Sequence, residues 1–330
     1  MNVRLLAFTD TGFALAVRLS EALGGEAFRC GAPLGLEEWT ERAFSKAKAL
    51  VFVGAAGIAV RAIAPFVKSK ATDPAVVVVD ELGRFAVPIL SGHLGGANDL
   101  ALKISELCGA VPVITTATDI HGLFAVDRWA VRQGCAVLNP EGIKAVSSKI
   151  LAGGTVGVSS DWPVEGEAPA GVRTVNSDAD VRLTVRRDGT NALVLVPRIA
   201  VLGVGCKRGT DAGSIEEAFQ ALLERSGLYT EAFCGVCSID LKQNEPGLLE
   251  FCRSHGIELN SFSADELENV QGNFSASEFV KSVTGVDNVC ERAAVLGSGG
   301  TLLVKKQAGN GVTMAAALKP FAPDWRWQDE

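Results

Sequence analysis

The chain has 330 residues, of which 48% are hydrophobic and 21% charged, and it contains 36 glycines. This length suggests about two domains, and the hydrophobic fraction excludes a disordered chain. The formal net charge of −7 gives no basic surplus that would indicate a nucleic-acid partner. The longest apolar run, residues 49–60, is interrupted by two glycines and is too short to span a membrane. The first ten residues lack the apolar stretch of a secretory signal, so we expect a cytoplasmic protein.

The eight cysteines are scattered, and only Cys234 and Cys237 form a C-x-x-C pair. Neither a second pair nor spaced histidines are present to complete a four-ligand zinc site. A chain with large cores in a reducing compartment does not need disulfides. We therefore expect free thiols packed within helices and strands.

The first part of the chain alternates strand and helix patterns. Strands are predicted at residues 3–8, 49–53, 75–79, 85–90 and 111–114, and helices at 14–23, 36–47, 58–67 and 100–107. Residues 81–84 are typical of a hairpin turn between two of these strands. The alternation predicts an α/β fold with mostly parallel sheets and helices on both faces.

A middle segment and a second α/β pattern follow. Helices are predicted at 124–133, 142–151 and 215–224, a strand at 155–158, a loop at 161–171, and a further strand from residue 199. Strand patterns at 181–185 and 192–196 flank Asp188-Gly189, which predicts a hairpin. The main boundary falls near Pro197. We expect two main α/β domains, residues 1–128 and 198–330, and a smaller middle segment, residues 129–197.

The loop after the strand at 49–53 is rich in glycine. Gly54 and Gly57 would let a backbone approach a ligand closely, and Arg61 follows one turn into the next helix. A guanidinium at that place can fork a carboxylate. Close packing of a helix on the sheet, with a surface arginine, explains these residues equally well.

Residues 91–99, SGHLGGAND, are the most informative stretch of the chain. His93 lies in this loop rather than on an apolar face, which favours a functional role. Gly95 and Gly96 are expected to expose amides as an anion nest, and Asn98 or Asp99 to cap the following helix. Ser91 lacks the glycine two residues earlier that a nucleophile elbow requires, because residue 89 is Ile.

Polar residues also follow the strand at 111–114. They supply hydroxyls, a carboxylate and a second histidine: Thr115, Thr116, Asp119 and His121. Such residues can take part in catalysis, but they also serve as ordinary turn and cap residues.

The third segment opens with another glycine-rich loop between a strand and a helix. Arg208 stands where a dinucleotide fingerprint needs its third glycine, and no Lys-Ser/Thr pair completes a P-loop. An anion-binding loop is the sharper interpretation, and a structural glycine turn is the alternative. Residues 214–217 fit a capping box, and a later polar turn contains Asp240 and Lys242. The loop's candidate ligand-binding residues are Gly203, Gly205, Cys206, Lys207, Arg208, Gly209 and Thr210.

Together these segments resemble the CbiG family of cobalamin biosynthesis, in order and over nearly the whole chain. The amino-terminal segments that carry the resemblance are GAAGIAVRAIAP, TDPAVVVVDELGRF, LSGHLGGANDLA and PVITTATD. The carboxy-terminal ones are GVGCKRGT, SIDLKQNEPGL and GSGGTLLVKK.

The resemblance implies a hydrolase that acts on cobalt-precorrin-5A, a cobalt-bearing tetrapyrrole with a δ-lactone on ring A. Water would open the lactone, and a two-carbon fragment would leave as acetaldehyde to give cobalt-precorrin-5B. Cobalt would arrive with the substrate, so no separate cofactor and no metal bound by the protein alone are expected. The substrate's many carboxylates call for several separate anion sites, and Arg61, Lys207 and Arg208 are candidates.

This chemistry needs a base and a donor to the developing oxyanion. We expect His93 as the base, since its ordinary pKa is about 6.5, with Asp119 or His121 as second choice. The Gly95 and Gly96 amides, or Ser91, would hold the oxyanion. The other substrate-binding candidates are Gly54, Gly57, Asn98, Thr115 and Thr116.

Three other functions fit the same loops. A non-catalytic binder or carrier of cobalt-corrinoid intermediates would use the same anion sites. A nucleotide-dependent enzyme is disfavoured by the failed phosphate-binding motifs. The carboxy-terminal segment would alternatively be a docking module for neighbouring enzymes of the pathway. The sequence does not predict an oligomeric state.

Overall fold

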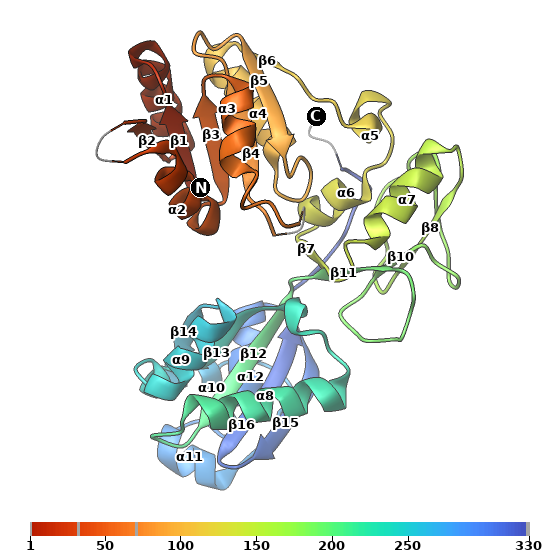
Figure 1. Ribbon diagram of the computed structural model, residues 1–330. Helices are drawn as coiled ribbons and strands as arrows, with labels where there is room; N and C mark the ends of the chain where they lie inside the picture. The colour runs from red at the N-terminus through yellow and green to blue at the C-terminus, as the bar shows by residue number, and fades with distance from the viewer. Residues whose placement is uncertain (1, 32–33, 70–71, 328–330) are drawn as a thin grey trace. The chain divides into compact units, whose positions relative to one another are not determined.

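The computed structural model describes residues 2–31, 34–69 and 72–327 (Figure 1). Internal contacts divide the chain into two units, one formed by residues 1–128 with 147–154 and the other by 129–146 with 155–330. Three mostly parallel sheets with covering helices confirm the predicted α/β class. In the described residues, no helix has the length and apolar character needed to cross a membrane. The eight cysteines are free thiols, as predicted.

The first unit contains a six-stranded sheet in the order β2-β1-β3-β4-β5-β6. β1 to β4 are parallel, β5 is antiparallel to β4, and β6 is parallel to β5. The predicted hairpin between β4 and β5 is confirmed, and Asp80 accepts hydrogen bonds from three amides of its turn. The strands are β1 (Val3–Ala7), β2 (Glu26–Arg29), β3 (Ala49–Val53), β4 (Ala75–Val79), β5 (Phe85–Leu90) and β6 (Val111–Pro112).

Helices cover both faces of this sheet because successive strand side chains point to opposite sides. Val51 and Val53 pack with the helices α1 and α4, whereas Leu50 and Phe52 pack with α2 and α3. Two short helices follow β6. The helices are α1 (Asp10–Leu23), α2 (Leu36–Lys46), α3 (Ala56–Ile63), α4 (Ala97–Cys108), α5 (Ala117–Ile120) and α6 (Val126–Arg132), of which the last continues into the second unit.

The reversed direction of β5 decides where the candidate loops lie. Gly54, which follows β3, donates its amide to Val79 O at the end of β4. Leu90, at the end of β5, pairs with Val76 near the start of β4. The loop after β3 therefore lies at one end of the strands, and the loop after β5 lies at the opposite end.

The middle part of the chain forms a five-stranded sheet in the order β7-β11-β10-β8-β9. Only the β7–β11 pair is antiparallel. Its elements are β7 (Cys135–Val137), α7 (Gly142–Leu151), β8 (Val156–Ser160), β9 (Val172–Thr174), β10 (Val181–Leu183) and β11 (Leu193–Pro197).

The hairpin predicted around Asp188-Gly189 is wrong, because β10 and β11 are parallel. The turn exists, but the chain has already left the sheet before it. Val185 O accepts the Tyr229 amide at 3.0 Å, and Arg187 N donates to Gly227 O at 2.7 Å. These bonds direct the chain away from β10. The chain then enters β11 in the same direction as β10, so the two strands are parallel.

The carboxy-terminal part forms a sheet in the order β14-β13-β12-β16-β15, in which β12, β13 and β14 are parallel. Helices α8 and α9 pack on one face, and α10 and α12 on the other. The strands are β12 (Ala200–Cys206), β13 (Phe233–Ile239), β14 (Leu259–Phe262), β15 (Thr301–Gly309) and β16 (Val312–Leu318). The helices are α8 (Ala212–Ser226), α9 (Pro246–His255), α10 (Ala264–Glu268), α11 (Glu278–Thr284) and α12 (Val289–Ser298), with single 3₁₀ turns η1 (Thr230–Ala232) and η2 (Asp240–Lys242).

Helix α8 is capped by Asp211, whose side chain accepts the Ser214 amide at 2.8 Å. The capping box predicted at 214–217 is therefore wrong by one turn. An acidic cap three residues earlier accepts the Ser214 amide instead, so the helix begins before the predicted box.

The last described segment, residues 320–327, returns from β16 to the middle part of the chain (Figure 1). The Trp325 ring stacks on Trp129 with 5.4 Å between ring centroids and 15° between the planes. Trp129 Nε1 donates to Asp324 O at 2.6 Å. Both tryptophans are buried, so residues 129 and 325 pack together in the interior.

Candidate active site

The loop after β5 is folded tightly against the start of α4. Three amides at this place donate to the loop's own carbonyls: Ala97 N to Ser91 O, Asn98 N to Gly92 O, and Gly96 N to His93 O. The N-cap of α4 is Gly96 with φ of 83°, and no side chain caps the helix. The predicted cap by Asn98 or Asp99 is therefore wrong. The Gly96 amide already has a partner, so it does not form the expected anion nest.

His93 is held between two carboxylates. Its Nε2 lies 2.8 Å from Asp119 Oδ2 and its Nδ1 lies 2.9 Å from Asp127 Oδ1. The side chain is only 8% exposed. Burial alone would lower the pKa of His93, but the hydrogen bonds to the two carboxylates outweigh it and raise the pKa to about 9. At neutral pH the ring is a cation that donates from both nitrogens, so in this arrangement it has no lone pair for the expected role as a base.

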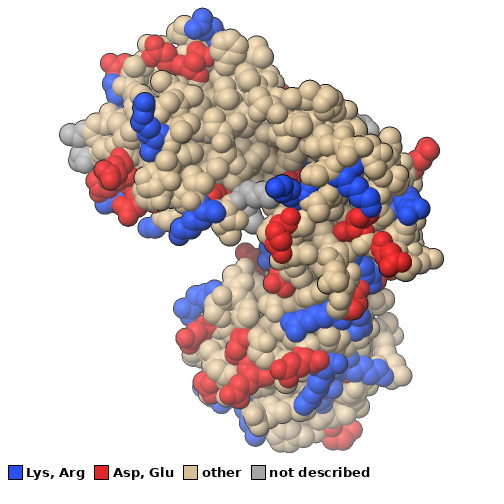
Figure 2. All heavy atoms as spheres, turned by 45° about the vertical axis from the view of Figure 1, so that its right-hand side comes forward, with Lys and Arg blue, Asp and Glu red and all other residues tan. Residues whose placement is uncertain are grey.

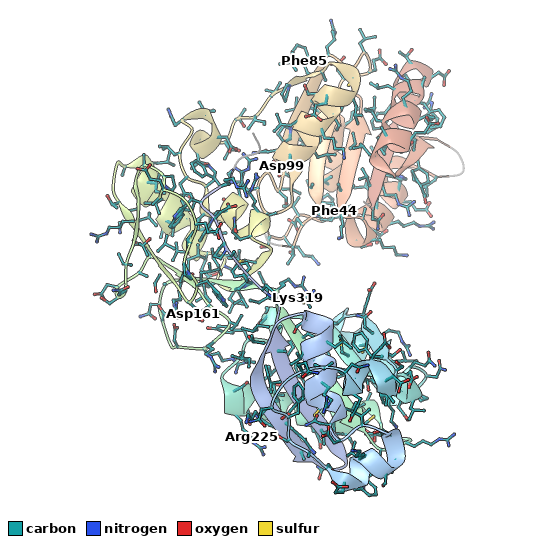
Figure 3. The ribbon with its side chains drawn as sticks, turned by 180° about the vertical axis from the view of Figure 1, so that it is seen from behind. Phe44, Phe85, Asp99, Asp161, Arg225 and Lys319 are labelled. Atoms are coloured by element: carbon teal, nitrogen blue, oxygen red, sulfur yellow. The ribbon has the colours of Figure 1, made fainter. Side chains whose placement is uncertain are left out.

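Asp119, in the short helix α5, is the most connected carboxylate of this cluster. Its Oδ2 also accepts Asn98 Nδ2 at 2.8 Å, and its Oδ1 accepts Arg128 Nη1 at 3.3 Å. Burial raises the pKa of Asp119, but His93 and Arg128 outweigh that effect and hold it below its ordinary value. Arg128 Nη2 also donates to Asp99 Oδ1 at 2.8 Å (Asp99 is labelled in Figure 3). Asp119 is therefore an oriented anion.

Asp127 and Arg128 were missed by the sequence analysis. They occupy the first turn of α6, where an acidic residue is ordinary because it complements the helix dipole. The only sequence signal is that they are two adjacent charged residues within an otherwise apolar run, residues 123–131. The structure brings them to His93 and Asp119 over sequence distances of 34 and 9 residues.

Ser91 combines two unfavourable features. Its φ of 55° lies in the left-handed region, which is costly for a residue with a Cβ. Its side chain is buried, and within the described part of the chain its Oγ has no hydrogen-bond partner. Gly95 fits here because a Cβ on it would lie 2.4 Å from Ser91 Cβ.

Of the remaining residues predicted around this loop, two contact the His93 cluster and two do not. Thr116 Oγ1 accepts Asn98 Nδ2 at 3.1 Å, so Thr116 and Asn98 belong to the cluster. Thr115 and His121 are exposed nearby in the chain. The structure assigns no role to either residue.

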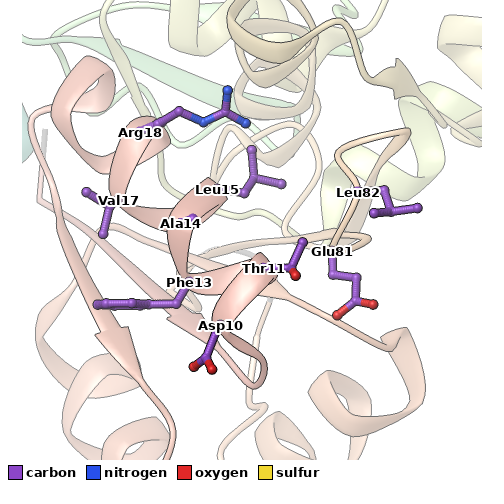
Figure 4. Close-up of a pocket in the computed structure, with 9 residues that line it drawn as sticks. All are labelled: Asp10, Thr11, Phe13, Ala14, Leu15, Val17, Arg18, Glu81 and Leu82. Carbon is purple, nitrogen blue, oxygen red and sulfur yellow. The ribbon is translucent and has the colours of Figure 1, made fainter.

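The structure does not bring the loop after β3 to His93. Gly54 packs against the Phe8 ring, and Gly57 and Arg61 are exposed at the opposite end of the strands. A hollow of about 680 Å³ lies along α1 and the β4–β5 turn (Figure 4). Its lining includes Asp10, Arg18 and Glu81 but none of the residues predicted from the sequence.

Packing explains the first glycines of the carboxy-terminal loop. A Cβ on Gly203 would lie 1.8 Å from Cys290 O in α12, and one on Gly205 would lie 2.6 Å from Thr313 Oγ1. Glycine is required at 203 because the helix lies directly on the strand, whether or not a ligand binds.

The anion expected in the carboxy-terminal loop is supplied by the chain itself. Glu245 accepts Gly209 N at 2.7 Å and Lys242 Nζ at 2.8 Å. Lys207 and Arg208 are exposed at the same edge. Three other candidates lie beside them: Cys206, whose pKa is raised by burial, Thr210, which donates to Lys207 O, and Asp240 in η2. On the face drawn in Figure 2, Lys and Arg side chains are interspersed with Asp and Glu.

The chain is therefore an α/β protein in which a buried histidine lies between two carboxylates. Three family models match consecutive parts of it. They are described as Cobalamin synthesis G N-terminal, residues 38–119, Cobalamin biosynthesis central region, residues 124–200, and Cobalamin synthesis G C-terminus, residues 200–317. The chain belongs to the CbiG family of cobalamin biosynthesis.

Curated relatives agree with this assignment. A protein of Salmonella typhimurium named cobalt-precorrin-5A hydrolase is 34% identical, with 96% of this chain and 97% of that protein covered. One of Priestia megaterium with the same name is 33% identical, with 84% and 80% covered. A solved cobalamin biosynthesis protein G homolog from Sulfolobus solfataricus is 22% identical, with 97% of each chain covered and a TM-score of 0.43. The curated relatives confirm the predicted enzyme class, a hydrolase.

Proposed function

We propose that the chain hydrolyses cobalt-precorrin-5A to cobalt-precorrin-5B by opening the ring A δ-lactone and releasing acetaldehyde. The names of the curated relatives support the substrate and the type of reaction. The structural observation that carries the proposal is the cluster of His93, Asp119, Asp127 and Arg128, which offers both a carboxylate base and cations in a largely buried place.

The reaction divides into two steps. In the first, water adds to the lactone carbonyl carbon, its proton passes to a base, and the carbon–oxygen bond of the lactone breaks. In the second, the freed hydroxyl gives up its proton and its oxygen forms the carbonyl of acetaldehyde. The bond to the macrocycle then breaks, and the conjugated macrocycle takes the electron pair. Cobalt belongs to the substrate, so we assign no resident metal.

We assign the base to Asp119 rather than His93. Asp119 Oδ1 accepts one long hydrogen bond, from Arg128, and this oxygen has a second lone pair for a water proton. The His93 imidazolium keeps Asp119 ionised and oriented, and its charge stabilises negative charge that develops nearby. Ser91 and the Gly95 amide remain the candidates for the oxyanion donor, because the Gly96 amide is already bonded.

The substrate's acetate and propionate groups need cations at several places. Arg61, Lys207 and Arg208 are exposed, and Lys207 and Arg208 lie beside the loop that Glu245 already fills. We propose these three as peripheral carboxylate contacts.

An anaerobic assay with enzymatically prepared cobalt-precorrin-5A tests the proposal. The wild-type chain should release one acetaldehyde per macrocycle, with loss of the two-carbon unit by mass. Asp119→Asn should lower kcat by about 10²–10³-fold, the usual contribution of a general base. The control is Asp10→Asn, which alters an exposed carboxylate of the same unit.

Two results would overturn parts of this account. A wild-type chain that binds the macrocycle but leaves it intact is a carrier, and the catalytic roles fall with it. Full turnover by Asp119→Asn, with normal turnover by Asp10→Asn, would remove Asp119 as the base.

A further inference from the structure

The side chains that hold Asp119 come from elements of different rigidity. Its Oδ2 accepts His93 Nε2 and Asn98 Nδ2, each at 2.8 Å, and its Oδ1 accepts Arg128 Nη1 at 3.3 Å. Asp119 itself lies in α5, a helix of only four residues, which is too short to fix its own position. His93 lies in a loop, whereas Asn98 lies in α4, a helix of 12 residues.

Helix α4 gives Asn98 a fixed position relative to the sheet. The helix packs on the core of the first unit through four buried residues, Ala97, Leu100, Ala101 and Ile104. Asn98 itself is only 2% exposed. A hydrogen bond from a packed helix restrains Asp119 relative to the sheet, which a hydrogen bond from a loop residue alone does not.

Both hydrogens of the Asn98 amide are used within the cluster. One is donated to Asp119 Oδ2 and the other to Thr116 Oγ1, at 3.1 Å. A primary amide has two hydrogens on its nitrogen, and turning it over would place its oxygen against the Asp119 carboxylate. The amide therefore has one favourable orientation, in which its nitrogen faces Asp119.

Gly92 provides the space that this amide occupies. A Cβ on Gly92 would lie 2.9 Å from Asn98 Oδ1 and 3.4 Å from Asn98 Nδ2. The backbone of Gly92 lies outside the left-handed region, so room for the amide, rather than the backbone conformation, explains the glycine. The main chains are joined as well, because Asn98 N donates to Gly92 O at 3.0 Å.

We propose that Asn98 is a positioning residue for Asp119. Because Asn98 and His93 both bond to Oδ2, the carboxylate cannot turn, and Oδ1 keeps a lone pair directed away from them for a water proton. A displacement of about 1 Å at a catalytic group can cost about 10²-fold in rate, so this restraint matters for turnover. The catalytic consequence rests on the proposed function, whereas the contact of Asn98 with Asp119 is measurable without substrate.

The first test is a carboxyl NMR titration of the full chain, in which the Asp119 signal is identified by its loss in Asp119→Asn. Asn98→Ala removes a hydrogen bond to the ionised carboxylate, so the pKa of Asp119 should rise. Gly92→Ala keeps the amide but displaces it, so it should raise the same pKa by less. Asn2→Ala is the matched control, because it removes an amide of the same unit that donates to Lys46 O at 2.9 Å. It should leave the pKa of Asp119 unchanged.

A histidine NMR titration shows whether the cluster is intact in these variants. Asn98→Ala leaves both carboxylates beside His93, so the pKa of His93 should stay near the wild-type value of about 9. A general collapse of the site would instead lower that pKa toward the ordinary value of about 6.5. A loss of activity with an unchanged His93 titration is therefore an effect on the position of Asp119.

Asn98→Asp tests the hydrogen bond without changing the size of the side chain. The new carboxyl group donates to Asp119 only while it is protonated, and the neighbouring charge of Asp119 favours that protonated form. The hydrogen bond is then lost as the pH rises. The ratio of the kcat of Asn98→Asp to that of the wild type should therefore fall with increasing pH.

Activity adds a further readout. If the wild type releases acetaldehyde, Asn98→Ala should lower kcat by up to about 10²-fold while KM changes little, and the acidic limb of its pH profile should move to higher pH. An unchanged pKa of Asp119 in folded Asn98→Ala overturns the inference. If that variant does not fold, the same result in Gly92→Ala overturns it. A wild type without activity overturns the proposed function but leaves the NMR result on Asp119 standing.

Discussion

Raising the pH should destabilise the folded chain through loss of the extra proton on His93, in a defined range. The pKa of His93 is about 9 in the folded chain and about 6.5 in the unfolded chain. A group whose folded pKa is raised contributes stability that is fully present below the unfolded pKa and is lost as the pH rises through the folded pKa. The window is therefore about pH 6.5 to pH 9.

The magnitude follows from the same two values. Each unit of pKa difference corresponds to about 1.4 kcal/mol, so the proton on His93 contributes at most about 3 kcal/mol to the free energy of unfolding. Urea unfolding of the wild type and of His93→Gln, at about pH 6 and about pH 10.5, isolates this contribution. The advantage of the wild type over the variant should be larger at the lower pH by up to that amount. The pKa of Asp119 is held below its ordinary value by His93 and Arg128, so this carboxylate does not titrate in that window.

One result would refute the reasoning directly. If the difference in unfolding free energy between wild type and His93→Gln is the same at both pH values, then His93 does not carry an extra proton in the folded chain. The ring would then be neutral at pH 7 and free to act as a base, as the sequence alone suggested.

Two further substitutions test features of the packing. Ser91→Ala should raise the free energy of unfolding by about 1 kcal/mol in urea unfolding, because it removes a buried hydroxyl that lacks a partner among the described residues; a loss of stability would mean that the hydroxyl is bonded. Gly203→Ala should lower thermal stability by about 1–3 kcal/mol, because the added Cβ would lie 1.8 Å from Cys290 O. An unchanged melting temperature would show that α12 can move away from the strand at no cost.

Much of the fold could be predicted because the strands are continuous apolar runs. Residues 49–53 and 75–79 match β3 and β4 at both ends. Such strands are buried on both faces and need no partner information to be recognised. The direction of a strand is different, because its sequence reads the same in a parallel or antiparallel pair. The hairpin at β4–β5 was recognised from its turn, whereas the similar turn at Asp188-Gly189 failed because bonds to residues 227–229 prevail.

The candidate site could be predicted only in part for the same reason. His93, Asp119 and Asn98 were selected because they follow strand ends, and the structure brings them together. Asp127 and Arg128 come from a helix start that no local pattern marks as functional. The pKa of His93 depends on its distances to two carboxylates that are far away in the sequence. Its raised pKa therefore could not be predicted from the sequence.

The pairing of Trp129 with Asp324 spans 195 residues, which bears on how the protein is made. A ribosome adds about 5–20 residues per second, so Trp129 is synthesised roughly 10–40 s before Asp324. During that interval the Trp129 indole lacks the residues that later cover it. It therefore remains available for contact with other chains. We therefore expect the first sheet to form while the chain is still being synthesised, and Trp129 to become buried only after residues 324 and 325 have left the ribosome. Cells short of chaperones should accumulate this protein in aggregates that form through the exposed Trp129 region.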